Sequence, residues 1–145
     1  MHLVDVHTHL DHPQFARDLP EVIKRAKANG VVALITQGVY HEKNILLLEL
    51  AKTDPIIKIA FGLYPLDAIN VKVDDALAAG DDYTRQSDIS VDNTLSAIRM
   101  HKESIIAIGE VGMDFKYSED KEAQTENLRK IIRLAKEINK PLIIH

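Results

Sequence analysis

The sequence contains no cysteine among its 145 residues. This absence excludes disulfide bonds, thiolate nucleophiles and thiolate metal sites, so any metal ligand must be a histidine or a carboxylate. Such ligands suit Zn²⁺, Mn²⁺, Fe²⁺ or Mg²⁺. The chain also lacks an excess of positive charge: its formal net charge is -4 and its pI is about 5.9. The net charge therefore predicts no strong electrostatic attraction to a nucleic-acid backbone, although bound metal ions could supply positive charge locally.

Long apolar runs are also missing from the sequence. No segment is long enough to cross a bilayer, and the N-terminus leads directly into an expected strand without a charged and apolar leader. We therefore expect no membrane partner and a cytoplasmic location.

Short β-branched runs alternate with segments of helical periodicity along the whole chain. The expected strands cover 3–7, 31–36, 56–61, 105–109 and 141–144, and the expected helices cover 19–29, 42–53, 90–102 and 121–139. A further short helix is expected at 75–79, within a polar stretch. In the last long helix, one stripe is predicted to be buried: Leu128, Ile131, Ile132, Ala135 and Ile138. This alternation predicts an α/β fold with a parallel sheet.

Three of the expected strands end on a residue that can bind a metal. His7 ends the first strand and His9 follows two positions later, so both imidazoles lie on one face of the extended chain. Glu110 follows the fourth strand and His145 follows the fifth. In a parallel α/β protein the carboxyl ends of the strands gather on one side, where active sites lie.

A curved sheet brings these strand ends together more readily than an open sheet does. A complete (β/α)₈ barrel needs about 250 residues, so we predict an incomplete TIM-barrel type fold. It comprises about the first five β/α units and forms a single domain over residues 1–145. We expect the chain to be a truncated form whose first and last strands are open edges. Such edges favour pairing with another copy, which predicts a homo-oligomer.

Three blocks closely resemble the TatD family of metal-dependent deoxyribonucleases. They are the segment from Val4 to Asp11, the Gly-Glu-Val-Gly-Met-Asp run at 109–114, and the final Pro-Leu-Ile-Ile-His at 141–145. The resemblance spans the whole chain but only the N-terminal part of a typical member. It implies a TIM barrel with two divalent metal ions that cleaves phosphodiester bonds in DNA or another phosphodiester.

The resemblance also implies roles for individual residues. His7 and His9 would hold the first metal, Glu110 would bridge both ions, and His145 would hold the second. Family members add a histidine on the sixth strand and an aspartate near the eighth, which orients the attacking water; that general base is expected beyond this chain. Where many relatives have Gly-x-His-Pro-His, this chain has Tyr64 and Leu66 in place of both histidines, which predicts a different substrate preference.

Two other function classes stay open at this point. An amidohydrolase or a PHP-type phosphoesterase also begins with His-x-His, but amidohydrolases often bridge their metals with a modified lysine where this chain has Glu110. The other alternative is an inactive, incomplete barrel that needs a second chain.

Several neighbouring residues have two alternative roles each. Asp5 either accepts a hydrogen bond from an imidazole or caps a barrel layer, whereas Asp11 and Asp114 either orient ligands or cap loops. Lys116 and Tyr117 either meet a phosphate or base or form a solvated loop. The remaining histidines that lack partner spacing are expected at the surface or at helix starts: His12, His41 and His101.

Overall fold

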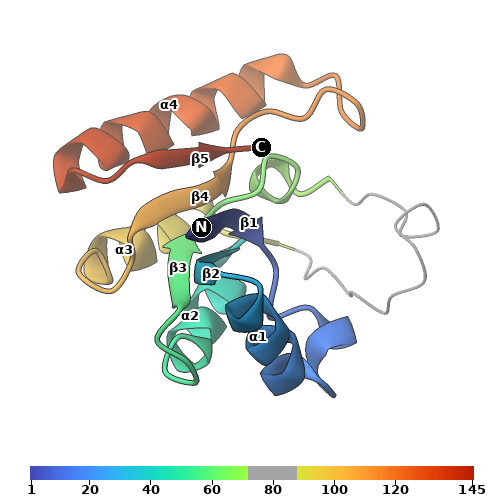
Figure 1. The fold of residues 1–145 in the computed structure, drawn as a ribbon. Helices are drawn as coiled ribbons and strands as arrows, with labels where there is room; N and C mark the ends of the chain where they lie inside the picture. The colour runs from blue at the N-terminus through green and yellow to red at the C-terminus, as the bar shows by residue number, and fades with distance from the viewer. Residues whose placement is uncertain (72–87) are drawn as a thin grey trace.

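The computed structural model describes residues 1–71 and 88–145 of the chain. Five parallel strands form one curled sheet in the order of the sequence (Figure 1). They are β1 (Leu3–Thr8), β2 (Val31–Gln37), β3 (Ile57–Phe61), β4 (Ala107–Val111) and β5 (Leu142–Ile144). The expected α/β fold, an incomplete TIM barrel, is confirmed.

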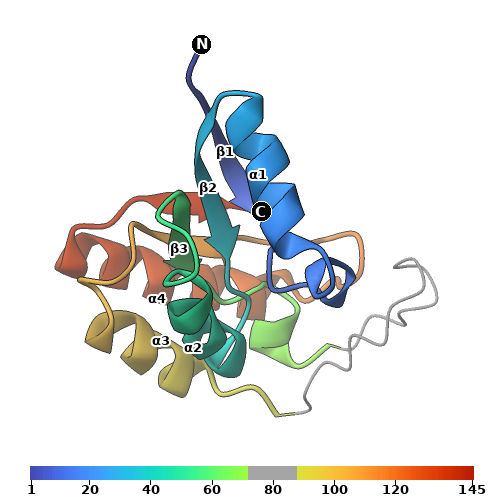
Figure 2. The same ribbon diagram turned by 60° about the horizontal axis from the view of Figure 1, so that its bottom comes forward.

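Helices connect the strands and lie along the outer side of the curled sheet, as Figures 1 and 2 show. They are α1 (Leu19–Ala28), α2 (His41–Leu50), α3 (Val91–Met100) and α4 (Lys121–Ile138), with short 3₁₀ helices η1 (Pro13–Phe15) and η2 (Asp67–Ile69). This arrangement follows from the parallel pairing, because each strand must return to the same end of the sheet through a crossover.

The hydrophobic core lies between the central strands and these helices. All of β4 is buried, and four of the five residues of β3 are buried, as expected for strands that are covered on both faces. Ile98 of α3 and Ile131 of α4 pack into the same cluster, both at 2 % exposure or less. The strand ends that carry the candidate metal ligands are therefore attached to a well-packed core.

The strand β1 differs from the central strands because most of its residues are exposed. Val4 and Val6 each expose 54 % of their surface. Within the described residues, β1 and β5 each pair with a neighbour on one side only, so the sheet has two open edges.

Three expectations need correction or fall outside the description. Glu110 lies inside β4 rather than after it, because the strand begins at Ala107 and continues to Val111. In α4, Ile132 is exposed and Leu134 is buried in its place, so the apolar stripe is turned slightly from the expected one. The helix expected at 75–79 lies outside the described residues.

Among the described residues, no helix is both long and apolar enough to cross a lipid bilayer.

Candidate metal centre

His7, His9 and Glu110 meet at the ends of β1 and β4, although more than a hundred positions separate the two histidines from Glu110 in sequence. The Nε2 atoms of His7 and His9 lie 3.3 Å apart, and each lies 3.2 Å from Oε2 of Glu110. The ligand atoms of the three residues all lie within 4.8 Å of one another, so they could together hold a metal ion. The two histidines are about one-third exposed, whereas Glu110 is buried.

The donor set and its spacing fit a small divalent ion. Two imidazole nitrogens and one carboxylate oxygen form the three-ligand set of many catalytic zinc sites, which leave a further position open. Ligand atoms that each lie about 2.05 Å from a tetrahedral ion are about 3.3 Å apart. The nearly equal separations among His7, His9 and Glu110 match that spacing.

His145 approaches the same carboxylate from the other side. Its Nδ1 contacts Oε1 of Glu110, so the two oxygens of Glu110 face different histidines. Its backbone N–H donates a 2.8 Å hydrogen bond to the carbonyl of Val111, which continues the parallel pairing of β4 with β5. This backbone contact holds the imidazole next to Glu110.

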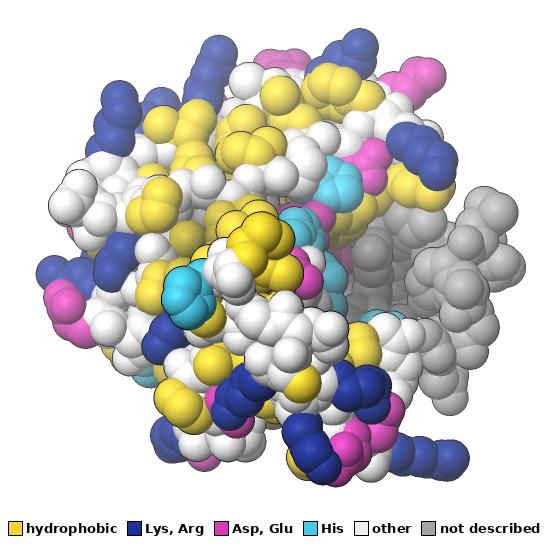
Figure 3. Space-filling model, viewed as in Figure 1, with side chains coloured by type: hydrophobic (Ala, Val, Ile, Leu, Met, Phe, Trp, Pro, Cys, Tyr) yellow, Lys and Arg dark blue, Asp and Glu magenta, His cyan; other side chains and the backbone are white. Residues whose placement is uncertain are grey.

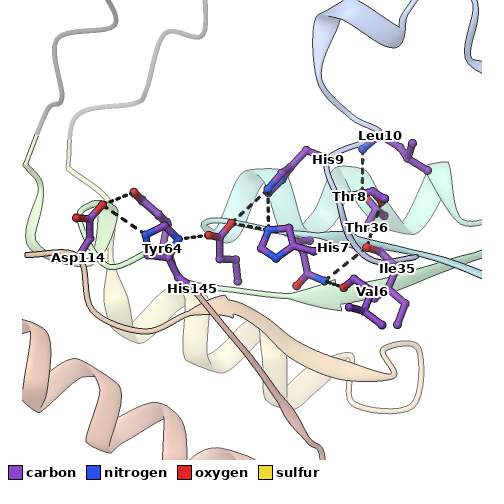
Figure 4. Close-up of polar contacts among 12 residues, drawn as sticks. Val6, His7, Thr8, His9, Leu10, Ile35, Thr36, Tyr64, Asp114 and His145 are labelled. Carbon is purple, nitrogen blue, oxygen red and sulfur yellow. Dashed lines mark hydrogen bonds and ion pairs between the residues drawn. The ribbon is translucent and has the colours of Figure 1, made fainter. Parts of the chain in front are cut away.

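Asp114 lies behind His145, and each of the two carboxylate oxygens of Asp114 has a contact of its own. Its Oδ2 accepts a 2.8 Å hydrogen bond from the phenol of Tyr64 and lies 3.4 Å from Nε2 of His145. The Tyr64 and His145 rings meet edge to face, with their centroids 4.9 Å apart. Figure 4 shows Tyr64, Asp114 and His145 on one side of the centre and His7 with His9 on the other.

Gly62 allows the strand ends to approach one another beneath this centre. The N–H of Glu110 donates a 3.0 Å hydrogen bond to the carbonyl of Gly38, across the end of β3. A Cβ atom on Gly62 would lie 2.2 Å from that carbonyl oxygen and 2.3 Å from the Glu110 nitrogen. Only glycine leaves room there, so residue 62 fixes the position of Glu110 without contacting its side chain.

A polar side chain inside the barrel holds β1 against β2. Gln37 is buried at 1 % exposure, and its amide donates a 2.8 Å hydrogen bond to the carbonyl of Val6, directly before His7. The N–H of Leu10 donates to the hydroxyl of Thr36, just beyond His9. These two bonds hold the segment that carries both histidines.

The contacts within the centre keep the carboxylate of Glu110 ionised. Burial raises the pKa of this carboxyl, but hydrogen bonds from His9 and His145 and the charges of His7 and His145 outweigh it and lower the pKa from 4.5 to about 2. The hydrogen bond to Glu110 raises the pKa of His9 above 6.5, against the opposing effect of burial. The centre therefore holds a negative charge that protonated imidazoles, or a cation in their place, can neutralise.

The other acidic residues singled out from the sequence make more local contacts. Asp5 accepts a hydrogen bond from the backbone N–H of His7, not from an imidazole. Asp11 forms an ion pair with Lys43 of α2 at 3.6 Å.

The remaining histidines take part in local structure. His12 accepts a hydrogen bond from the Gln14 N–H at the start of η1, and His41 begins α2. The ring of His101 packs against Phe61, with the centroids 5.6 Å apart.

Sequence reasoning missed the residues that support the centre from behind. Gln124 of α4 is buried and holds both the N–H and the carbonyl of Asp114, at 2.6 and 3.0 Å. The sequence does offer a signal, because Gln124 lies four and seven positions before Leu128 and Ile131 and is thus a polar residue on the buried stripe of α4. Gln37 has a comparable signal, since it is a polar residue at the end of an otherwise apolar strand.

A histidine pair and a buried glutamate thus lie together at the carboxyl ends of a curled parallel sheet, which is a candidate metal site on a partial TIM barrel. In the view of Figure 3, several histidine side chains lie near the middle of the molecular surface. The family model described as "TatD related DNase" matches residues 4–145. The chain belongs to this family, as its sequence motifs indicated.

Similar proteins agree with this assignment. An uncharacterized metal-dependent hydrolase of Bacillus subtilis, YabD, is 35 % identical over 144 residues, covering 99 % of this chain and 50 % of that protein. The human deoxyribonuclease TATDN3 is 31 % identical, covering 99 % and 51 %. The crystal structure of the TatD homologue YjjV from Escherichia coli superposes with a TM-score of 0.73 at 26 % identity, covering 99 % and 50 %. The chain thus spans about half the length of these relatives.

Proposed function

We propose that this chain carries the metal centre of a hydrolase that cleaves phosphodiester bonds, with DNA as the expected polymer. The observation that carries this proposal is the convergence of His7, His9 and Glu110 on one point, at separations that fit a divalent ion. Family membership and the name of the human relative, a deoxyribonuclease, support the choice of substrate.

In this proposal each side chain has a stated role. His7 and His9 would hold one divalent ion (Mg²⁺, Mn²⁺ or Zn²⁺) together with one oxygen of Glu110, whose other oxygen contacts His145. A carboxylate that faces two sides suits a bridge between two ions, and His145 would hold the second. Bound divalent ions of this kind lower the pKa of a coordinated water and polarise a phosphoryl oxygen.

In this proposal Asp114 orients the imidazole of His145 and does not activate water. Its oxygens are occupied by the Tyr64 phenol, the Lys116 backbone N–H and the His145 imidazole. These contacts also lower the pKa of Asp114 despite the opposing effect of burial, so it stays an acceptor that fixes the orientation of the imidazole.

The test is cleavage of a single-stranded DNA oligomer with added Mg²⁺ or Mn²⁺, comparing the protein with its Glu110→Ala variant. Cleavage that requires both the metal and Glu110 supports the proposal. Glu49→Ala is the matched control, because Glu49 is an exposed glutamate on α2. Cleavage that survives Glu110→Ala, or that needs no metal, contradicts it.

The exposed edge strand supports a second proposal about assembly. The valines of β1 are more than half exposed, and both β1 and β5 pair on one side only within the described residues. Self-association through these edges would cover the exposed valines and pair the unpaired strand edges. A cytoplasmic location stays a prediction.

A further inference from the structure

The loop between β4 and α4 presents two exposed aromatic rings. Phe115 exposes 46 % of its surface and Tyr117 exposes 38 %. A lysine ammonium lies over each ring: Lys121 is 5.0 Å from the Phe115 centroid, and Lys116 is 4.6 Å from the Tyr117 centroid. Neither the core nor the metal centre accounts for these rings.

The loop is anchored directly to the metal centre through Asp114. Gln124 holds the backbone of Asp114 on both sides, and the Lys116 N–H donates a 2.9 Å hydrogen bond to its Oδ1. The other oxygen of Asp114 contacts Tyr64 and His145, as Figure 4 shows. The exposed rings therefore follow, within three residues, a side chain fixed against His145.

We propose that Phe115 and Tyr117 form a stacking platform for unpaired bases of a nucleic-acid strand whose backbone reaches the metal centre. The proposal rests on the proposed function and adds a substrate-binding site to it. Exposed aromatic rings bind bases through their π-faces with little dependence on sequence, because every base offers such a face. Lys116 and Lys121 would then lie beside the backbone phosphates.

The charge of the loop indicates that bases supply more of the attraction than phosphates do. Two exposed acidic residues, Glu119 and Asp120, follow Tyr117 on the same loop and offset the two lysines. The chain as a whole carries a net charge of -4. Binding to this platform should therefore depend weakly on salt, unlike binding to a basic groove.

The absence of tryptophan from the chain makes a direct optical test possible. Phe115→Trp places a single tryptophan on the platform, and stacking of a base on the indole changes its fluorescence. The protein is kept in EDTA, so no metal-dependent cleavage can occur, and is titrated with a short oligothymidylate. Leu46→Trp, on the exposed side of α2, is the matched control.

We expect oligothymidylate to change the fluorescence of Phe115→Trp but not that of Leu46→Trp. A sugar-phosphate oligomer of the same length without bases should leave both unchanged. In the otherwise native protein, Phe115→Leu and Tyr117→Leu should each weaken oligothymidylate binding about tenfold, since the apolar area remains but the ring is lost.

Three results would overturn the platform. The baseless oligomer could bind as tightly as oligothymidylate, Phe115→Leu could bind as tightly as the native protein, or the leucine variants could change self-association without changing DNA binding. The last result would assign the rings to a protein interface.

Hydrolysis of bis(4-nitrophenyl) phosphate with added Mn²⁺ separates this inference from the proposed function, because it measures phosphodiester cleavage without a nucleic-acid strand. Metal-dependent hydrolysis without a fluorescence change refutes the platform alone. A fluorescence change without hydrolysis supports the platform and refutes the proposed activity.

Discussion

The phenol of Tyr64 donates a 2.8 Å hydrogen bond to Oδ2 of Asp114, and the same oxygen lies 3.4 Å from Nε2 of His145. In this chain a phenol therefore orients the carboxylate that in turn orients the candidate metal ligand.

Tyr64→Phe should remove this hydrogen bond while keeping the ring against His145. Loss of a bond to a charged acceptor costs about 1–3 kcal/mol of stability, and loss of a contact that supports a metal ligand typically weakens metal affinity about ten- to a hundredfold. Urea unfolding and calorimetric metal titration measure the two effects. Thr53→Ala removes an exposed hydroxyl that donates to the last residue of α2, Leu50, and should leave metal affinity unchanged. Equal metal affinity in both variants would show that Tyr64 has no positioning role.

Gly62→Ala should disturb the centre while leaving every candidate ligand side chain in place in the sequence. The added methyl would lie 2.2 Å from the Gly38 carbonyl oxygen and 2.3 Å from the Glu110 nitrogen, so the strand ends must move apart. Overpacking of this kind costs about 1–3 kcal/mol, and metal affinity should fall with it. A variant that unfolds at the same urea concentration as the native protein would contradict this account. Glu49→Ala, at an exposed site on α2, serves as the unperturbed reference.

The fold and the candidate ligands could be predicted from the sequence because periodicity and strand ends are local features. The pattern of short β-branched runs and amphipathic helices sufficed for the incomplete barrel. The ends of the strands were harder to predict. Glu110 was expected after the fourth strand, because a polar residue usually marks the end of a buried apolar run, but it lies within β4.

The sequence suggested Asp114 as a residue that orients a ligand or caps a loop, but its partners could not be predicted, since they come from distant segments. Asp114 meets Tyr64 across fifty positions, and Gln124 holds it from a helix that begins later. No periodicity encodes such contacts. The exposure of Ile132 shows the same limit on a smaller scale, because the neighbouring strands decide which stripe of α4 is covered.

The metal-free protein should be most stable at mildly acidic pH. The lowered pKa of Glu110, about 2 against 4.5, contributes at most about 3 kcal/mol of stability that is present above pH 4.5 and lost as the pH falls toward 2. The raised pKa of His9 contributes stability that is present below pH 6.5 and lost as the pH rises through the higher folded value. Stability should therefore peak between about pH 4.5 and 6.5.

Urea unfolding in EDTA across this pH range provides the measurement. Glu110→Gln should flatten both sides of the peak, because it removes the carboxylate that pairs with the imidazoles. Added metal should move the optimum to higher pH, since imidazole nitrogens bind a cation only when deprotonated. A profile that is the same in the native protein and Glu110→Gln would refute the pairing.

The exposed edge of β1 predicts self-association. Val4→Lys should shift the protein toward monomer, because a charge on an edge strand opposes pairing with another sheet. Val32→Lys tests whether any added lysine has this effect, since Val32 is exposed on β2, away from the edge. Sedimentation measures the distribution. A native protein that is fully monomeric at high concentration would contradict the prediction.

Calorimetric titration of the EDTA-treated protein with Mn²⁺ or Zn²⁺ tests the central claim most directly. The account predicts binding by the native protein and at least about a tenfold loss of affinity in His9→Ala and in Glu110→Gln. His101→Ala, at a ring that packs on Phe61, should bind like the native protein. Absence of binding, or equal affinity in all four proteins, would show that His7, His9 and Glu110 do not form a metal centre.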